Sequence, residues 1–216
     1  MISPKIVYSD LKKHYGWQQW WPAETAFEIM VGAILTQGTS WSNVEKAIDS
    51  LKSAHALDLE IINEMPIDHL SKLIYSAGFH NVKPDRLKSL SSYLMANFDG
   101  KIEALKRLPT GTARSQLLAI DGIGPETADA ILLYALGKSV FIVDTYTKRL
   151  FTRLGYAVEQ DSYDSWQAFF ISQMHKTTYT FQQYHALIVE HSKARCKSKP
   201  ICNSCPLASH CTFPSK

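Results

Sequence analysis

The chain has 216 residues, of which 45% are hydrophobic and 20% are charged. This is enough apolar sequence to bury a core, in one large domain or in two small domains around a shared cleft. The formal net charge of +3 is only a weak sign of a polyanionic partner. No apolar run approaches the roughly 20 residues that span a bilayer, and the N-terminus lacks a signal-peptide pattern. We therefore expect a soluble, cytoplasmic protein that does not enter a membrane. We also expect a monomer.

Helix signals recur from one end of the chain to the other, and strand signals are nearly absent. Thr25 with Glu28 predicts a capping box in front of the apolar run 27–35, and Ser42 with Glu45 predicts a second box. Hydrophobic periodicity and glycine stop signals then predict helices over 67–76, 84–97, 101–107, 112–119, 126–136, 145–154, 163–174 and 180–192. The expected fold class is all-α with short loops, without an internal repeat or a Pro/Gly-rich linker.

A turn with two glycines separates two of these helices. Gly122 and Gly124 enclose the apolar Ile123, and Pro125 suits the first position of the next helix. Backbone N–H groups at such a turn and helix start can bind a phosphate. The same pattern also suits an ordinary turn between helices that ends in a glycine cap.

A lone carboxylate, Asp144, follows the short apolar run 141–143 and precedes a predicted helix. The run is too short for a strand, so we expect an extended segment there. The order of hairpin, short helix and V-D-T-x-x-x-R resembles the helix–hairpin–helix (HhH-GPD) superfamily of DNA glycosylases, whose founding member is endonuclease III. The resemblance implies that Asp144 is the catalytic residue, whereas the motif alone also suits an aspartate that only caps a helix.

The reaction implied by the resemblance is hydrolysis of the bond between a damaged base and its sugar in double-stranded DNA. Breaking this bond builds oxocarbenium character on the sugar, which a carboxylate can stabilise while it directs a water. The base must first leave the helix stack. Gln37 matches the family residue that fills the vacated gap, and Phe79 matches a second residue that wedges into the duplex. Each also suits a loop residue without a special role.

All four cysteines lie in the last 21 residues, with the spacing Cys196-x5-Cys202-x2-Cys205-x5-Cys211. Four thiolates bind either zinc or an iron–sulfur cluster, and ligand type alone favours zinc. The spacing and the position instead resemble the [4Fe–4S] loop of endonuclease III, with five residues rather than the common six between the first two cysteines. The resemblance implies a structural cluster in a loop that touches the DNA backbone.

Residues 191–216 contain five basic residues and no acidic residue. An excess of this kind attracts phosphate groups, although it is equally typical of a solvated tail. The five residues are Lys193, Arg195, Lys197, Lys199 and Lys216. By the resemblance, the first four are expected to bind DNA.

Two positions differ from relatives with other activities. Relatives that also cut the strand carry a lysine after the hairpin, which forms an imine with the sugar; this chain has Glu126 there, and a glutamate cannot form an imine. Adenine-excising relatives carry a glutamate, in the helix before Gln37, that protonates the leaving base; this chain has Gly32. These differences predict a monofunctional glycosylase with weak or absent AP-lyase activity. Glu126 also suits a helix start, where the dipole favours a carboxylate.

The tryptophans narrow the predicted substrate. Trp20-Trp21-Pro22, with Trp41 shortly after Gln37, resembles the 3-methyladenine DNA glycosylase III branch, in which aromatic side chains enclose the flipped base. Stacking of a cationic purine on an indole contributes roughly 0.5–2 kcal/mol. The tryptophans also suit an ordinary core, and members of that branch can lack the cluster that the cysteines here imply.

The combined motifs predict a base-excision-repair glycosylase for alkylated purines such as 3-methyladenine and 7-methylguanine, at the nucleoid if the source is a prokaryote. The alternatives are an endonuclease III-like enzyme for oxidised pyrimidines or mismatched bases, and a non-catalytic module that binds damaged DNA. Two helical lobes are expected. Residues 22–133 would form a six-helix module with the hairpin, and residues 1–21 with 134–216 would form the cluster lobe, with the base pocket and Asp144 in the cleft between them.

Overall fold

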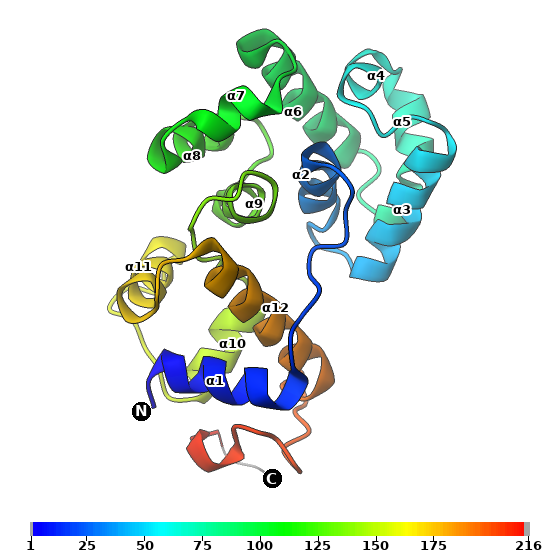
Figure 1. Ribbon diagram of the computed structural model, residues 1–216. Helices are drawn as coiled ribbons and strands as arrows, with labels where there is room; N and C mark the ends of the chain where they lie inside the picture. Colours follow the sequence, from blue (N-terminus) through cyan, green and yellow to red (C-terminus); the bar gives the residue numbers. More distant parts are fainter. Residues whose placement is uncertain (1, 214–216) are drawn as a thin grey trace. The chain divides into compact units, whose positions relative to one another are not determined.

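The computed structural model describes residues 2–213, and within that range it contains helices and no β-strand (Figure 1). The all-α fold class is confirmed. The α-helices are α1 (Pro4–Tyr15), α2 (Ala26–Leu35), α3 (Trp41–Ser53), α4 (Leu59–Glu64), α5 (Ile67–Leu73), α6 (Lys83–Phe98), α7 (Ile102–Arg107), α8 (Thr110–Leu118), α9 (Pro125–Ala130), α10 (Thr145–Arg153), α11 (Tyr163–Gln173) and α12 (Thr178–Ala194). Shorter segments are the 3₁₀ turns η1 (Tyr75–Ala77) and η3 (Ala208–His210) and the π-helical η2 (Ile131–Ala135). None of the described helices is both long enough and apolar enough to cross a membrane.

The described residues form two compact units. Unit 1 consists of residues 2–20 with 139–213, and unit 2 consists of residues 21–138. Trp21 and residues 134–138 belong to unit 2, although the sequence places them with the cysteines. The physical reason is that Trp21 packs against Tyr134 within unit 2, with ring centroids 5.3 Å apart. Unit 2 holds eight α-helices, α2 to α9, where the sequence predicts six.

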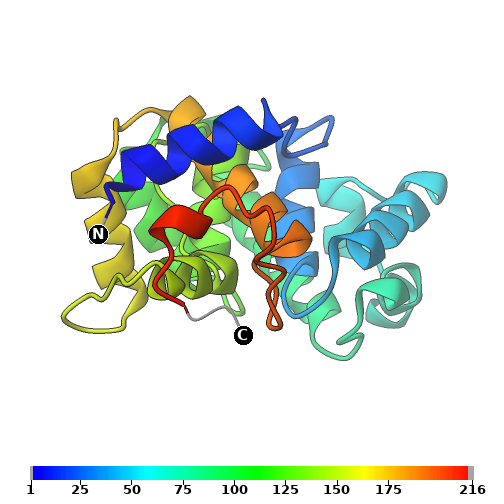
Figure 2. The same cartoon turned by 90° about the horizontal axis from the view of Figure 1, so that it is seen from below.

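The two ends of the chain pack together in unit 1. Helix α12 contacts both α1 and α10. The hydroxyl of the buried Tyr184 in α12 donates to Pro4 O at the start of α1, at 2.7 Å. Figure 2 shows the cysteine-bearing segment next to α1, where His210 Nε2 lies 3.7 Å from Asp10 Oδ2. Helix α1 therefore packs on α12 and also contacts the C-terminal segment.

Helix α2 is the centre of unit 2. It contacts α3, α6, α9 and η2, and eight of its ten residues are buried. A helix that is apolar on all sides needs neighbours that cover every face. Its buried carboxylate, Glu28, lies 2.9 Å from Lys52 Nζ of α3. This packing fixes the place of the loop that follows α2 relative to α6 and α9.

The helix starts agree with the sequence prediction at α2 and disagree at α3. Thr25 Oγ1 accepts a hydrogen bond from Glu28 N at 3.1 Å, whereas the Glu28 carboxylate accepts from Glu24 N and so completes only half of the predicted box. The second predicted box is wrong. Because α3 begins at Trp41, Ser42 lies inside the helix and cannot cap it.

A buried ion pair joins the two helices on either side of the glycine turn. Arg114 of α8 donates to Asp129 of α9 from Nε to Oδ1 at 2.9 Å and from Nη2 to Oδ2 at 3.2 Å. Asp129 is fully buried. Such a two-point contact fixes direction as well as distance. It therefore holds α8 against α9 and sets the shape of the turn between them.

Replacing Asp129 by alanine removes the carboxylate that Arg114 contacts. We expect the free energy of unfolding to fall by about 3–5 kcal/mol, the usual cost of breaking a buried pair from one side. Glu103→Ala is the matched control, because it breaks the exposed Glu103–Lys106 pair of α7 and should cost less than about 1 kcal/mol. Urea unfolding of both variants measures the difference, and equal losses would contradict the role given to the buried pair.

Candidate functional site

Asp144 lies at the N-terminus of α10 in unit 1, directly after the buried segment 141–143, which is neither helix nor strand. Its Oδ1 accepts from Thr147 N at 2.6 Å, and its Oδ2 lies 3.5 Å from His185 Nε2 of α12. Burial acts to raise the pKa of Asp144, but the hydrogen bonds from His185 and Thr147 outweigh burial and hold that pKa below its ordinary value. Asp144 is therefore a helix cap and also an ionised carboxylate at neutral pH.

Three aromatic side chains meet in unit 2. The rings of Trp21 and Trp41 are nearly perpendicular with centroids 5.1 Å apart, and Trp21 also contacts Tyr134. Gly32 of α2 makes room for the indole, since a Cβ at this position would lie 3.1 Å from Trp21 Cζ2. The close approach of the Trp21 indole thus favours glycine at position 32.

The other two predicted base-pocket residues are Trp20 and Pro22. Trp20 belongs to unit 1, where Lys193 Nζ of α12 lies 5.3 Å from the centre of its ring. Pro22 is exposed in unit 2. The structure therefore brings Trp21 and Trp41 together within one unit and assigns Trp20 to the other.

The glycine turn has the conformation that its sequence predicts. Gly122 has a φ of 82°, which favours glycine, and α9 begins at Pro125 after the cap residue Gly124. Ile123 is buried, so its side chain anchors the turn in the core. Gly124 and Glu126 are exposed, and the solvent-facing part of the turn is therefore the start of α9.

Gln37 is held by the hairpin. Its Nε2 donates to Gly122 O at 3.1 Å and to Thr127 Oγ1 at 2.8 Å, and its Oε1 accepts from Arg86 Nη1 of α6. The stem of Arg86 covers Gly122, because a Cβ there would collide with it. Both ends of the Gln37 amide are fixed, and three segments that are far apart in sequence meet at one side chain.

Phe79 lies beside the loop that carries Gln37. Its ring packs on Gly38, where a Cβ would come within 2.9 Å of Phe79 Cε2. The side chain is 61% exposed, and its φ of 48° is strained for a bulky residue. The two residues predicted to enter the duplex are thus carried by adjacent loops.

The buried Lys83 joins the bases of these two loops. Its Nζ donates to Leu35 O at 2.7 Å and to Ala77 O at 2.8 Å. Leu35 ends α2 and Ala77 ends η1, so each carbonyl lies just before one of the loops. Burial lowers the pKa of Lys83 to about 8.

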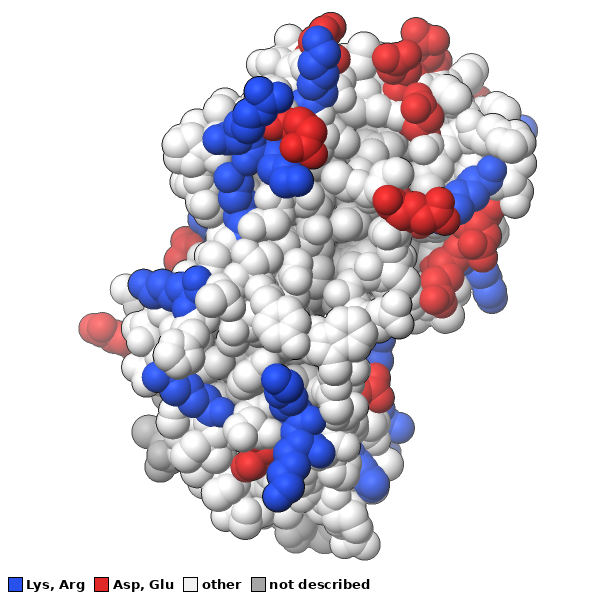
Figure 3. All heavy atoms as spheres, in the orientation of Figure 1, with Lys and Arg blue, Asp and Glu red and all other residues white. Residues whose placement is uncertain are grey.

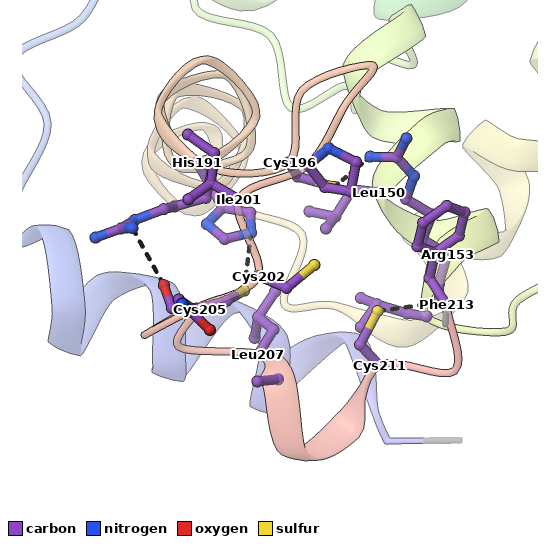
Figure 4. A pocket seen from close by; sticks show the side chains of 15 residues that line it. Leu150, Arg153, His191, Cys196, Ile201, Cys202, Cys205, Leu207, Cys211 and Phe213 are labelled. Atoms are coloured by element: carbon purple, nitrogen blue, oxygen red, sulfur yellow. Dashed lines mark hydrogen bonds between the residues drawn. The ribbon is translucent and has the colours of Figure 1, made fainter. Parts of the chain in front are cut away.

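The four cysteines line one pocket of unit 1, with a volume of about 170 Å³ (Figure 4). Apolar side chains complete much of its wall; they are Leu150, Leu154, Ile201, Leu207 and Phe213. Burial raises the pKa of the Cys205 thiol, and the three other cysteines raise it further. No group of three acidic, histidine or cysteine residues in the described range is placed to hold a single metal ion.

Polar groups contact the sulfur atoms from two sides. Arg153 Nη1 lies 3.3 Å from Cys196 Sγ, and His191 Nε2 lies 3.8 Å from Cys205 Sγ. The other ring nitrogen of His191 lies 3.0 Å from Tyr15 OH. Figure 4 shows Arg153 and His191 on different sides of the pocket. The cysteines thus have polar contacts on two sides as well as apolar neighbours.

The predicted basic residues differ in exposure. Lys193, Lys197 and Lys199 are exposed, whereas Arg195 is half-buried and donates from Nη1 to Asn203 O at 3.2 Å. Lys216 lies outside the described residues. Arg195 therefore also shapes the cysteine loop that follows α12.

Unit 2 carries its own charge asymmetry. Figure 3 shows basic side chains gathered over α7 and α8, with Lys106 and Arg107 in the last turn of α7. Acidic side chains gather over α3, α4 and α5 in the same view. A surface of this kind directs a polyanion towards the basic side.

Sequence reasoning missed several residues whose side chains contact the predicted site residues. They include Lys83, Arg86, Thr127, Tyr134, His185, Arg153 and His191. Lys83 and Arg86 directly follow the loop that carries Phe79, at the start of α6. This position was the only sign in the sequence that they contact the site. Residue type gives no sign that a lysine is buried or that a threonine accepts from an amide.

Comparisons with known sequences agree on one superfamily. A sequence profile described as "HhH-GPD superfamily base excision DNA repair protein" matches residues 31–171. A Methanocaldococcus jannaschii protein named as a DNA repair glycosylase is 45% identical over 207 residues, which cover 95% of this chain and 94% of that protein. Endonuclease III of Thermotoga maritima is 26% identical over 188 residues, covering 87% and 83% of the two chains.

Solved structures give the same fold. The 3-methyladenine DNA glycosylase (MagIII) of H. pylori, bound to 1,N6-ethenoadenine, superposes with a TM-score of 0.79 at 30% identity, covering 89% of this chain and 98% of that one. An endonuclease III–DNA complex superposes with a TM-score of 0.83 at 21% identity, covering 98% and 96%. The second likeness is one of fold alone.

Gly32→Ala tests the close approach of α2 to Trp21. The added methyl group would lie 3.1 Å from the indole, so we expect the ring to shift and the free energy of unfolding to fall by about 1–2 kcal/mol. Gly111→Ala is the matched control, because this glycine of α8 has open space around it and alanine there should be neutral or stabilising by up to about 1 kcal/mol. Urea unfolding measures both effects. Equal stability of the two variants would show that the indole is not confined.

Proposed function

Because the chain belongs to the HhH-GPD superfamily of base-excision DNA repair proteins, we propose that it is a monofunctional DNA glycosylase whose substrate is an alkylated purine. The enzyme class, a hydrolase of N-glycosyl bonds in DNA, follows from the superfamily. The choice of lesion rests on one observation, the packing of Trp21 against Trp41 and Tyr134 over Gly32.

The aromatic group favours a base that is positively charged. Indole faces attract cations, and alkylation at N3 or N7 gives a purine a positive charge. Gly32 supplies no acid for the leaving base, and a Cβ at this position would lie only 3.1 Å from the Trp21 indole. A cationic purine leaves without protonation, so it is the substrate class that this set of residues can process. The likeness at 30% identity to a 3-methyladenine DNA glycosylase supports the same class.

In the proposed mechanism Asp144 acts as an ionised carboxylate. Departure of the base leaves positive charge on the sugar, and a nearby carboxylate stabilises that charge and directs the attacking water. The low pKa of Asp144 keeps it ionised, and His185 with Thr147 N–H fixes its orientation. His185 is thus a positioning residue for the carboxylate.

The absence of strand cleavage is proposed from Glu126. This exposed residue stands in the first turn of α9, at the position of the lysine in relatives with lyase activity. A carboxylate carries no nitrogen nucleophile and cannot form the imine through which the sugar is opened. Hydrolysis by water, directed by Asp144, is then the remaining route.

The cysteine pocket fits a [4Fe–4S] cluster, and we propose that it holds one. The pocket has a volume of about 170 Å³ and brings together four cysteines, the usual ligand set of such a cluster, with apolar side chains around them. Thiolates repel one another in an apolar wall unless a cation is bound. The cluster would act as a cross-link that fixes the basic loop 197–199, while Arg153 and His191 face the thiolates of Cys196 and Cys205.

The second candidate function is an endonuclease III-like glycosylase for oxidised pyrimidines or mismatched bases. It is favoured by the full cysteine set and by the similarity to endonuclease III of Thermotoga maritima. An endonuclease III-like function does not explain why Gly32 and Glu126 stand at their positions, and we therefore rank it second.

Base release from defined duplexes tests the proposal. We expect release of 7-methylguanine and 3-methyladenine from methylated DNA, and little release from duplexes with thymine glycol or a uracil mismatch. Asp144→Asn should lower release by at least about 100-fold, because the charge that stabilises the sugar cation is lost. Release of the oxidised pyrimidine instead would establish the second candidate, and an Asp144→Asn protein with undiminished turnover would contradict the mechanism.

Borohydride trapping tests the absence of lyase activity in the same reactions. We expect no covalent protein–DNA adduct with an abasic or lesion-bearing duplex, because Glu126 cannot form the imine that borohydride reduces. An endonuclease III that carries the lysine serves as the positive control. A trapped adduct would overturn the monofunctional assignment.

Metal and sulfide analysis of anaerobically purified protein tests the cluster. We expect about four iron and about four sulfide per chain, with a brown colour. Cys202→Ser should lose the iron and unfold at lower denaturant concentration, whereas Ser209→Ala, on the nearby exposed η3, should keep both properties. One zinc per chain with no sulfide would overturn the proposal.

A further inference from the structure

Arg86 occupies an unusual place in unit 2, between a candidate DNA-inserting side chain and the glycine turn. Its Nη1 donates to Gln37 Oε1, and its stem lies over Gly122. We propose that Arg86 is a positioning residue that sets Gln37 for insertion into the duplex and couples that side chain to the hairpin. The inference rests on the proposed role of Gln37 and is independent of which lesion is released.

The hydrogen bonds of Gln37 leave its amide little freedom. An amide group has two donor hydrogens and one acceptor oxygen. The donors are directed to Gly122 O and Thr127 Oγ1, and the oxygen accepts from Arg86. A glutamine that must enter DNA loses rotamer freedom on binding unless it is already ordered in the free protein. Here the ordering is complete before DNA arrives.

The contribution of Arg86 differs from that of the other two partners. A guanidinium bound to the amide oxygen polarises the amide and strengthens the hydrogen bonds that its Nε2 donates. The contact of the Arg86 stem with Gly122 links the same side chain to the turn. A displacement of the turn on binding a phosphate would therefore move Gln37 with it.

The position of Arg86 is itself fixed. It lies one turn after Lys83, whose buried Nζ ties the start of α6 to Leu35 O and Ala77 O. The guanidinium consequently approaches Gln37 from a rigid helix, which is the geometry that preorganised sites require.

Binding to two matched duplexes tests the proposal. One duplex contains a tetrahydrofuran abasic analogue, which leaves a gap to fill, and the other is undamaged. Arg86→Met keeps the stem over Gly122 and removes the guanidinium. We expect about tenfold weaker binding to the abasic duplex, the usual loss for a charged hydrogen bond, with binding to the undamaged duplex within about twofold of wild type.

A double-mutant cycle shows whether Arg86 acts through Gln37. Gln37→Ala should give a similar loss on the abasic duplex, and the double variant should lose no more than either single variant. Arg86→Lys should recover part of the preference, because one donor is restored. Lys46→Met, which removes one exposed charge from α3, is the control for net charge and should leave the preference unchanged.

Three results would overturn the inference. If Arg86→Met weakens binding to both duplexes equally, Arg86 is a general phosphate contact or a fold element. If the losses of the two single variants multiply in the double variant, Arg86 acts independently of Gln37. A wild-type protein without preference for the abasic duplex would overturn both the role of Gln37 and the inference. If the wild-type protein prefers the abasic duplex but releases no base, only the proposed function is overturned.

Discussion

The ammonium group of Lys83 carries a positive charge into the interior of unit 2, where an unpaired charge would be strongly destabilising. Leu35 O and Ala77 O accept its hydrogen bonds, and both are carbonyls at helix ends, where the helix dipole favours a cation. Since the two carbonyls come from segments far apart in the sequence, the charge holds those segments together. The loops that carry Gln37 and Phe79 are adjacent for this reason, and α6 starts from a fixed point.

The position of α6 determines the contacts around the glycine turn. Helix α6 presents Arg86 one turn later, and Arg86 reaches both Gln37 and the hairpin glycine Gly122. The hairpin in turn depends on the buried pair of Arg114 with Asp129, which fixes α9 against α8. A small number of buried polar contacts thus determines the placement of segments whose outer parts remain exposed. A binding site for a polyanion needs exposed segments that rigid elements hold in place.

Sequence patterns were sufficient for elements with strong local signals. The apolar run of α2, the glycine turn and the capping aspartate of α10 all lie where the sequence predicts them. Helices α1 and α4 have no counterpart in the prediction, although the side chains of Ser3 and Asp58 cap them. The sequence did not predict the partners of the site residues either. His185 contacts Asp144 although 41 positions separate them in the chain, and no sequence periodicity encodes that contact. Long-range polar contacts depend on packing and not on local propensity.

Gly32 shows how packing and chemistry constrain one another at the candidate site. In the proposed function an acid for the leaving base would stand at this position of α2, where a Cβ alone would lie 3.1 Å from the Trp21 indole. A glutamate there would press on Trp21 and so disturb its contacts with Trp41 and Tyr134. In the proposed function the aromatic surface and the missing acid have the same physical cause, and both favour a base that is already charged.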